Sequence, residues 1–208
     1  MAKKKILSIQ KIKRDYRLSF YDNSELDISY KDYFKYDLFI DGEIDSELLE
    51  ILTENYHYYR CYEFGLKRIK NKRYTVAEMK KKLKAREFTG NIIERVIEEF
   101  LRLNLLNDED YAEIYILNRM ENDNDGYLKI KRSLEKRGIP TGIIENQLSE
   151  LITDEYEADA LEKLIEKKIK TYSDKLTTQK KKEKLFLYLK NKGFFRGKIV
   201  SALIKYFK

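Results

Sequence analysis

The chain has 208 residues, of which 42% are hydrophobic and 38% are charged, and its formal net charge is +7. The charged fraction exceeds the usual value of about 25%, but the apolar residues recur periodically, so the composition does not indicate disorder. A positive balance of this size favours a polyanionic partner and says little about the fold. The single cysteine, Cys61, excludes an intrachain disulfide framework. Because the N-terminus lacks a cleavable apolar segment and no apolar run reaches about 18 residues, we expect a soluble, cytoplasmic protein with no membrane partner.

The first 45 residues are predicted to form a small β-rich cap. Residues 6–12 alternate in the manner of a strand, and residues 16–29 are typical of two strands joined at Asp22-Asn23, a pair that tolerates positive φ. We interpret the cap as a hydrophobic lid on the helices that follow, and a separate contact module for the same partner is the alternative. Residues 1–60 carry 10 Lys and Arg against 12 Asp and Glu, so the excess positive charge lies in the later helices.

The rest of the chain is predicted to be helical and to contain one three-helix unit three times. Leu83, Leu134 and Leu189 correspond at offsets of 51 and 55 residues. Five further apolar columns follow the same offsets: Met79, Ile130 and Leu185; Phe88, Ile139 and Phe194; Ile93, Ile144 and Ile199; Ile97, Leu148 and Leu203; and Leu101, Ile152 and Phe207. A short three-helix unit buries little by itself, so neighbouring copies are expected to supply the missing core.

The predicted fold is therefore mostly α, an elongated and curved stack of three tandem three-helix repeats behind a small N-terminal β-rich cap. The cap takes residues 1–45, the connecting helix and repeat 1 take 46–106, repeat 2 takes 107–153, and repeat 3 takes 154–208. Thr75 and Glu78 form a capping box that opens the second helix of repeat 1. Gly138 is the expected C-cap of the second helix of repeat 2, and Gly193 stands at the equivalent position of repeat 3. Repeat 1 has Glu87 there, so we expect that repeat to end its second helix differently.

No catalytic or metal-binding constellation is present in the sequence. His57 is the only histidine, and one histidine with one cysteine cannot form a zinc site of the usual kind. The acidic run 121–126 does not fit a calcium loop, because Arg132 stands where the bidentate glutamate is required. Residues 108–110 could be imagined as magnesium ligands, but the N-cap signal Asn107-Asp108 explains them more simply. We therefore expect a protein without a cofactor or metal that is not an enzyme, and the absence of a P-loop argues against nucleotide hydrolysis.

The helix expected from Tyr127 onward is predicted to have one apolar and one basic side. Three apolar residues, Tyr127, Ile130 and Leu134, fall opposite three cations, Lys129, Arg132 and Lys136, at about 100° per residue. The matching helix of repeat 1 is also surrounded by lysines. The predicted partner- or DNA-binding surface consists of Lys80, Lys81, Lys84, Arg119, Lys129, Lys131, Arg132, Lys136 and Arg137. A solvated, solubilising face is the alternative, and the Lys-rich run 180–184 of repeat 3 leaves the same two interpretations open.

Three stretches of the sequence resemble a known family. LLNDEDYA (105–112), Arg119 and GYLKIKRSLEKRGI (126–139) are similar to the signature of the RecX family. The preceding copy, RYTVAEMKKKLKAREFTGNIIERVIEEFLRLNLL (73–106), resembles the first repeat of that family, while repeat 3 diverges most.

This resemblance implies a regulatory protein that modulates the RecA recombinase in recombination, DNA repair and the SOS response. Such a protein lies in the groove of the RecA–DNA filament and usually inhibits ATP hydrolysis, strand exchange and coprotease activity. The implied partner is the RecA filament, with direct contacts to single- or double-stranded DNA as a further option, and we expect a monomer. The alternative is a stand-alone basic nucleic-acid-binding helical module, which would bind naked DNA with steep salt dependence.

Overall fold

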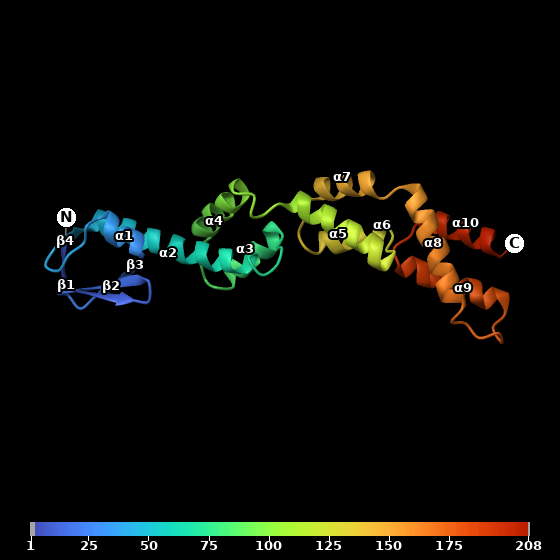
Figure 1. Ribbon diagram of the computed structural model, residues 1–208, viewed down its shortest axis with the longest axis horizontal. Coiled ribbons are helices and arrows are strands. Elements are labelled where there is room, and N and C mark those ends of the chain that lie inside the picture. Colours follow the sequence, from blue (N-terminus) through green and yellow to red (C-terminus); the bar gives the residue numbers. More distant parts are fainter. Residues whose placement is uncertain (1–2, 208) are drawn as a thin grey trace. The chain divides into compact units, whose positions relative to one another are not determined.

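The computed structural model describes residues 3–207 and shows a mostly helical chain with a small N-terminal sheet, which confirms the predicted fold class (Figure 1). The strands are β1 (Lys3–Ile12), β2 (Asp15–Phe20), β3 (Glu25–Ile28) and β4 (Glu43–Asp45). The helices are α1 (Tyr30–Lys35), α2 (Ser46–Ile69), α3 (Val76–Lys84), α4 (Gly90–Arg102), α5 (Asp108–Asp123), α6 (Tyr127–Glu135), α7 (Thr141–Leu151), α8 (Asp154–Ile169), α9 (Thr178–Asn191) and α10 (Arg196–Tyr206).

The chain divides into two compact units. The first unit contains the chain up to Lys72 together with Met79–Leu105. The second contains Arg73–Glu78 together with the chain from Leu106 onward. The first turn of α3 therefore belongs to the second unit, and the rest of that helix belongs to the first.

The sheet of the first unit is antiparallel, with the strand order β3-β2-β1-β4. Asn23 takes a φ of 65° at the turn between β2 and β3, as the Asp22-Asn23 pair predicts. The apolar side of the sheet forms a cluster that includes Leu18, Phe20 and, from α2, Leu52. The cap thus packs on the first turns of α2. The sequence interpretation missed α1, a helix of 6 residues inside the cap whose N-cap is Ser29.

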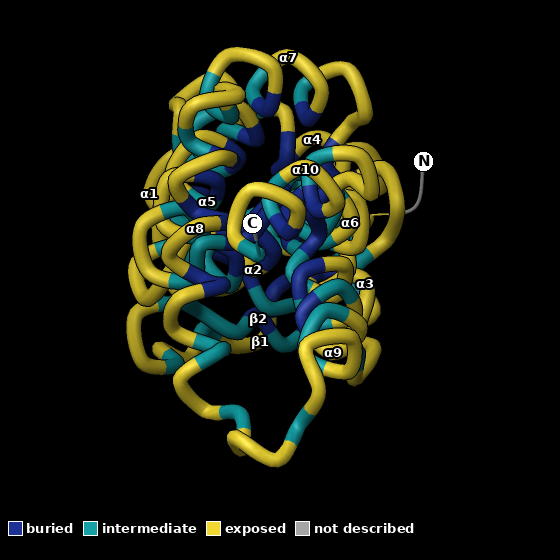
Figure 2. The backbone as a smooth tube through the Cα atoms, turned by 90° about the vertical axis from the view of Figure 1, so that its right-hand side faces the viewer, coloured by how far each residue is buried: buried dark blue, intermediate teal, exposed yellow. Residues whose placement is uncertain are grey.

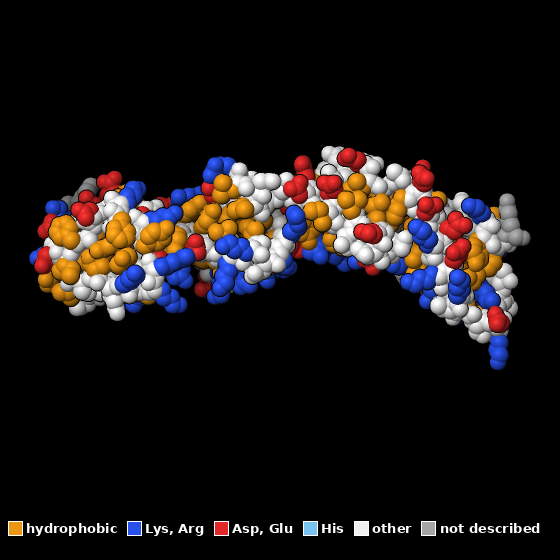
Figure 3. Space-filling view, viewed as in Figure 1, with side chains coloured by type: hydrophobic (Ala, Val, Ile, Leu, Met, Phe, Trp, Pro, Cys, Tyr) orange, Lys and Arg blue, Asp and Glu red, His pale blue; other side chains and the backbone are white. Residues whose placement is uncertain are grey.

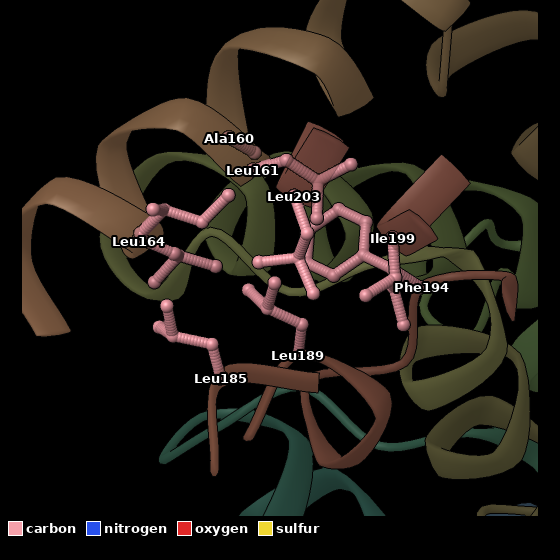
Figure 4. Packing of buried hydrophobic residues seen from close by; sticks show 9 residues of the cluster. Ala160, Leu161, Leu164, Leu185, Leu189, Phe194, Ile199 and Leu203 are labelled. Atoms are coloured by element: carbon pink, nitrogen blue, oxygen red, sulfur yellow. The ribbon is translucent and has the colours of Figure 1, made fainter. Parts of the chain in front are cut away.

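The predicted columns describe the cores of the helical repeats well. Four columns are buried in all three copies: Met79, Ile130 and Leu185; Leu83, Leu134 and Leu189; Ile93, Ile144 and Ile199; and Ile97, Leu148 and Leu203. The helices at the edge of Figure 2, α7 and α9, are buried on the inner side and exposed on the outer side, as an amphipathic helix should be. Figure 4 shows Leu185 and Leu189 of α9 directed toward the apolar side chains of α8 and α10.

Two columns are less regular than predicted. Phe88 is only half-buried, whereas its counterparts Ile139 and Phe194 are buried. Leu101 is 45% exposed, so the prediction that it belongs to the core is wrong. It lies in the last turn of α4, where the neighbouring residue Phe100 is fully buried and occupies the core in its place.

The end of the second helix is the same in all three repeats, which corrects the expectation for repeat 1. Glu87 takes a φ of 62°, close to the values of 75° for Gly138 and 94° for Gly193. A Cβ at Gly138 would lie 2.4 Å from the Cβ of Ala77, and a Cβ at Gly193 would lie 2.4 Å from the backbone nitrogen of Lys129. Both glycines therefore approach the second helix of the preceding repeat closely. Repeat 1 has no preceding repeat, so its left-handed residue is free to carry a side chain.

Hydrogen bonds accompany this close approach, and we call each such contact a repeat joint. At the first joint, Thr75 Oγ1 donates to the carbonyl oxygen of Arg137 at 2.7 Å. At the second, the backbone nitrogen of Gly126 donates to the carbonyl oxygen of Lys192 at 2.8 Å, and that of Leu128 donates to Gly193 at 2.9 Å. Both joints lie inside the second compact unit. The starts of α3 and α6 are thereby fixed against the repeat that follows each of them.

Candidate functional site

The basic side of α6 is built on an apolar anchor. Ile130 and Leu134 are 1% and 0% exposed and belong to the core cluster of the central repeat, and Tyr127 packs against that cluster as a half-buried ring. On the other side, Arg132 and Lys136 are exposed, and neither forms an ion pair within residues 3–207. The anchor holds the helix in place, so these two cations are presented to solvent from a fixed backbone.

Lys129 does not project with them, which corrects the predicted set of three free cations. Its Nζ lies 2.8 Å from a carboxylate oxygen of Asp125, four residues earlier. Asp125 is fully buried and also pairs with Arg119 at 2.8 Å and Lys192 at 3.2 Å. We call these four residues the Asp125 cluster. It joins α5, α6 and the end of α9, so Lys129 and Arg119 contribute to the second repeat joint.

The backbone around Asp125 is held by the same groups. Lys192 Nζ donates to the carbonyl oxygen of Asp123 at 2.7 Å, and Tyr156 Oη donates to that of Asp125 at 3.0 Å. Burial raises the pKa of the Tyr156 phenol, so this hydroxyl stays protonated and remains a donor. The acidic run that does not fit a calcium loop is therefore a structural junction. Among the residues described, no group of His, Cys, Asp and Glu is arranged to hold a metal ion.

Two other predicted cations of the second unit are also paired. Arg137 Nη1 lies 2.7 Å from Glu78 of the capping box, and its guanidinium lies over the rings of Tyr111 and Tyr115. Lys131 pairs with Glu145 at 2.9 Å, and this hydrogen bond raises the pKa of the Lys131 ammonium. Arg137 thus helps to form the first repeat joint, while Lys131 links α6 to α7.

In repeat 1, the predicted cations divide in the same way. Lys80 pairs with Glu94, whereas Lys81 and Lys84 are exposed and form no ion pair within the described residues. Figure 3 shows Lys and Arg side chains gathered around α3. Of the nine predicted contact residues, the structure thus leaves Lys81 and Lys84 in the first unit and Arg132 and Lys136 in the second as cations without an ion pair among residues 3–207.

The acidic residues at the start of α5 have capping roles. Asn107 is the N-cap, as predicted, and its side chain accepts from the backbone nitrogens of Glu109 and Asp110 at 2.9 and 3.1 Å. Asp108 instead accepts from the backbone nitrogen of Val76 at 2.9 Å and so caps α3, a helix of the preceding repeat. Burial raises the pKa of the Asp108 carboxyl.

No helix in the described part of the chain is both long and apolar enough to cross a membrane.

The sequence interpretation missed the contacts that Asp125 and the capping-box residue Glu78 make with distant residues. Asp125 stands two residues before the start of α6 and four residues before Lys129, a spacing that predicts an ion pair. Its contacts with Arg119 and Lys192 depend on the fold. The sequence predicts Glu78 as part of a capping box, but its pairing with Arg137, 59 residues away, depends on the stacking of the repeats.

Comparison with known proteins gives one consistent result. No family model matches the chain. Regulatory protein RecX of Clostridium beijerinckii is 32% identical over 99% of this chain and 95% of its own length. Regulatory protein RecX of Lactococcus lactis subsp. lactis is 32% identical over 91% of this chain and 72% of its own length.

Two solved structures have the same fold. A crystal structure of regulatory protein RecX aligns with a TM-score of 0.77 at 21% identity and covers 97% of this chain and 99% of its own. The crystal structure of RecX from Lactobacillus salivarius aligns with a TM-score of 0.67 at 28% identity, over 72% of this chain and 96% of its own. The fold of the described residues is therefore that of known helical repeat structures.

Proposed function

Because this chain belongs to the RecX family of regulatory proteins, we propose that it regulates the RecA recombinase by binding the RecA–DNA filament. Bound there, it restrains ATP hydrolysis, strand exchange and coprotease activity in recombination and DNA repair. The repeat boundaries 46–106, 107–153 and 154–208 belong to the same proposal, with the central repeat as the main contact unit.

The observation that carries the proposal is the pair of exposed cations on α6. Arg132 and Lys136 stand on a helix anchored by Ile130 and Leu134, and they have no ion pair among the described residues. The nearby cations are already neutralised by Asp125, Glu145 and Glu78. An exposed charge on a fixed helix attracts an oppositely charged surface and fixes its register, which suits the phosphates or carboxylates of a nucleoprotein filament.

The proposed action is binding and not catalysis. The relatives are named as regulatory proteins, and the only histidine of the chain, His57, is exposed on α2. Its neighbour Cys61 is buried, and burial raises the pKa of this thiol to about 11. A thiol in this state is a poor nucleophile.

Reversing the two α6 charges tests the proposal. In the variant carrying Arg132→Glu and Lys136→Glu, the fold should stay intact, because both side chains are exposed and unpaired. The concentration needed to suppress the DNA-dependent ATPase of RecA should rise by about tenfold or more, because attraction becomes repulsion. The effect should be largest at low salt, where the Debye length is longest.

The matched control reverses two lysines of α8. Lys163 and Lys167 are also exposed and form no ion pair among residues 3–207, so Lys163→Glu with Lys167→Glu makes the same change in net charge. This control should suppress the ATPase like the wild type. Equal behaviour of the two double variants would show that α6 is only a solvated face.

A further inference from the structure

A second basic surface lies in the first compact unit, outside the α6 face. A hollow of about 650 Å³ opens between α2 and the segment that follows α3. Its lining includes Arg60, Phe64 and Lys67 from α2 and Arg86 and Phe88 from the following segment. Arg60, Phe64 and Lys67 are spaced to lie along one side of the helix. The left-handed residue Glu87 turns the chain at this point, which places Arg86 and Phe88 against α2.

Aromatic rings and guanidinium groups contact one another in and beside this hollow. The guanidinium carbons of Arg68 and Arg86 lie 4.9 and 5.1 Å from the ring centroid of Phe64. The ring of Phe88 lies 6.3 Å from that of Phe64, and Arg60 lies over Tyr56 at 5.8 Å. Guanidinium planes and aromatic rings both offer flat faces on which a nucleobase can stack.

The charge of the hollow is not neutralised by the protein. Its three lining cations, Arg60, Lys67 and Arg86, and Arg68 beside the lining ring of Phe64 are exposed and form no ion pair within the described residues. The lining contains two carboxylates, Glu63 and Glu87, and Glu63 already pairs with Arg14. Positive charge therefore remains available for phosphate groups.

We propose that this hollow binds single-stranded nucleic acid. Bases would stack on Phe64, Phe88 and the guanidinium planes of Arg68 and Arg86, and the charges of these two arginines, together with those of Arg60 and Lys67, would neutralise neighbouring phosphates. A single strand fits better than a duplex, because duplex bases are already stacked on each other and their faces are not accessible. An acidic protein would use the charges but would leave the rings and guanidinium planes without a role. The inference goes beyond regulation of RecA and does not depend on it.

The test uses the full-length protein and a labelled oligo(dT) strand, with no RecA present. In the variant Arg68→Gln with Arg86→Gln, the affinity measured by fluorescence anisotropy should fall by roughly tenfold. The slope of log affinity against log salt should decrease by about 1.4, the value expected for two phosphate contacts on a single strand. The wild-type protein should quench the fluorescence of an oligonucleotide that carries 2-aminopurine, because the base stacks on the protein. The variant should not cause this quenching.

A matched control and a conservative variant separate stacking from charge. Arg95→Gln with Arg102→Gln removes two arginines that already pair with Glu54 and Glu99 in the same unit, one of them also lying over Tyr58, and it should bind within about twofold of the wild type. Arg68→Lys with Arg86→Lys keeps the charge but loses the planar groups. This variant should keep the salt slope, bind more weakly and lose the quenching.

Three results would overturn the proposal. The first is that the two Gln variants bind the strand equally well. The second is that the Lys variant behaves like the wild type in all three measurements, which would reduce the hollow to a patch of charge. The third is that polyglutamate competes for the surface as well as oligo(dT) at equal charge, which would identify an acidic protein as its partner. Thermal melts of each variant exclude loss of folding as the cause.

Discussion

Replacing Asp125 by asparagine should destabilise the second compact unit more than any other single change of charge around α6. Asp125 has no exposed surface and lies within 3.2 Å of Arg119, Lys129 and Lys192. Asparagine keeps the shape of the side chain but removes its charge. The three cations then face each other across a neutral group, and the second repeat joint loses its electrostatic centre.

The size of the effect follows from the burial of each partner. Breaking a buried ion pair by removing one partner costs about 3–5 kcal/mol, because the remaining charge is left uncompensated. Here the side chains of Arg119, Lys129 and Lys192 keep 29%, 35% and 19% exposure, so water can hydrate them in part. We therefore expect a loss near the lower end, about 3 kcal/mol. For a chain of this length, that loss corresponds to a decrease of roughly 6–12 °C in Tm.

Thermal melts and denaturant titrations followed by circular dichroism measure this change. The control is Asp123→Asn, two residues away, because Asp123 pairs with Arg119 at 2.7 Å but its side chain is 38% exposed. An exposed pair of this kind contributes about 1 kcal/mol or less. If Asp125→Asn and Asp123→Asn lowered the free energy of unfolding equally, the Asp125 cluster would not be structural and Lys129 would have to be counted again as a contact residue.

Three further outcomes can be checked on the protein alone. Leu134→Ala should cost roughly 2–5 kcal/mol in a denaturant titration, whereas Leu101→Ala should cost less than about 0.5 kcal/mol because Leu101 is largely exposed. Gly138→Ala should destabilise by more than about 1 kcal/mol, since its φ is positive and its Cβ would meet Ala77 at 2.4 Å; Glu87→Gly at the equivalent turn should be neutral or stabilising by up to about 1 kcal/mol, and the reverse order in thermal melts would refute the joint geometry. Cys61 should react slowly with a thiol reagent in the native state and fully in denaturant, because it is buried and its pKa is raised to about 11; fast native labelling would show that α2 opens.

The helical repeats could be predicted because apolar spacing reports directly which side of a helix is packed. Leu83, Leu134 and Leu189 are all fully buried, and the capping box at Thr75 is present with the expected bond from the Glu78 backbone nitrogen to Thr75 Oγ1. The same spacing rule predicts Leu101 in the core, but periodicity does not decide which of two adjacent apolar residues is packed, and Phe100 is the buried one.

The candidate site could be predicted only in part, because helical spacing identifies ion-pair partners within one turn but not those that are distant in the sequence. Lys129 and Arg132 are both cations on the polar side of one helix, and Lys129 is the one that stands four residues after Asp125. Only the fold brings Lys192, 67 residues away from Asp125, to the same carboxylate. The left-handed backbone conformation of Glu87 is a second feature that the sequence does not predict. A glutamate is not expected at a left-handed position, and the reason it is tolerated is the absence of a preceding repeat, which local sequence does not report.

The most direct test of the proposed function compares two substrates in one binding experiment. The protein is titrated against naked single-stranded DNA and against the same DNA coated with RecA and a slowly hydrolysed ATP analogue. Regulation through the filament predicts at least about tenfold tighter binding to the coated DNA, with this preference lost in the variant carrying Arg132→Glu and Lys136→Glu. Equal or tighter binding to naked DNA, unchanged in that variant, would contradict the account and favour a stand-alone nucleic-acid-binding module.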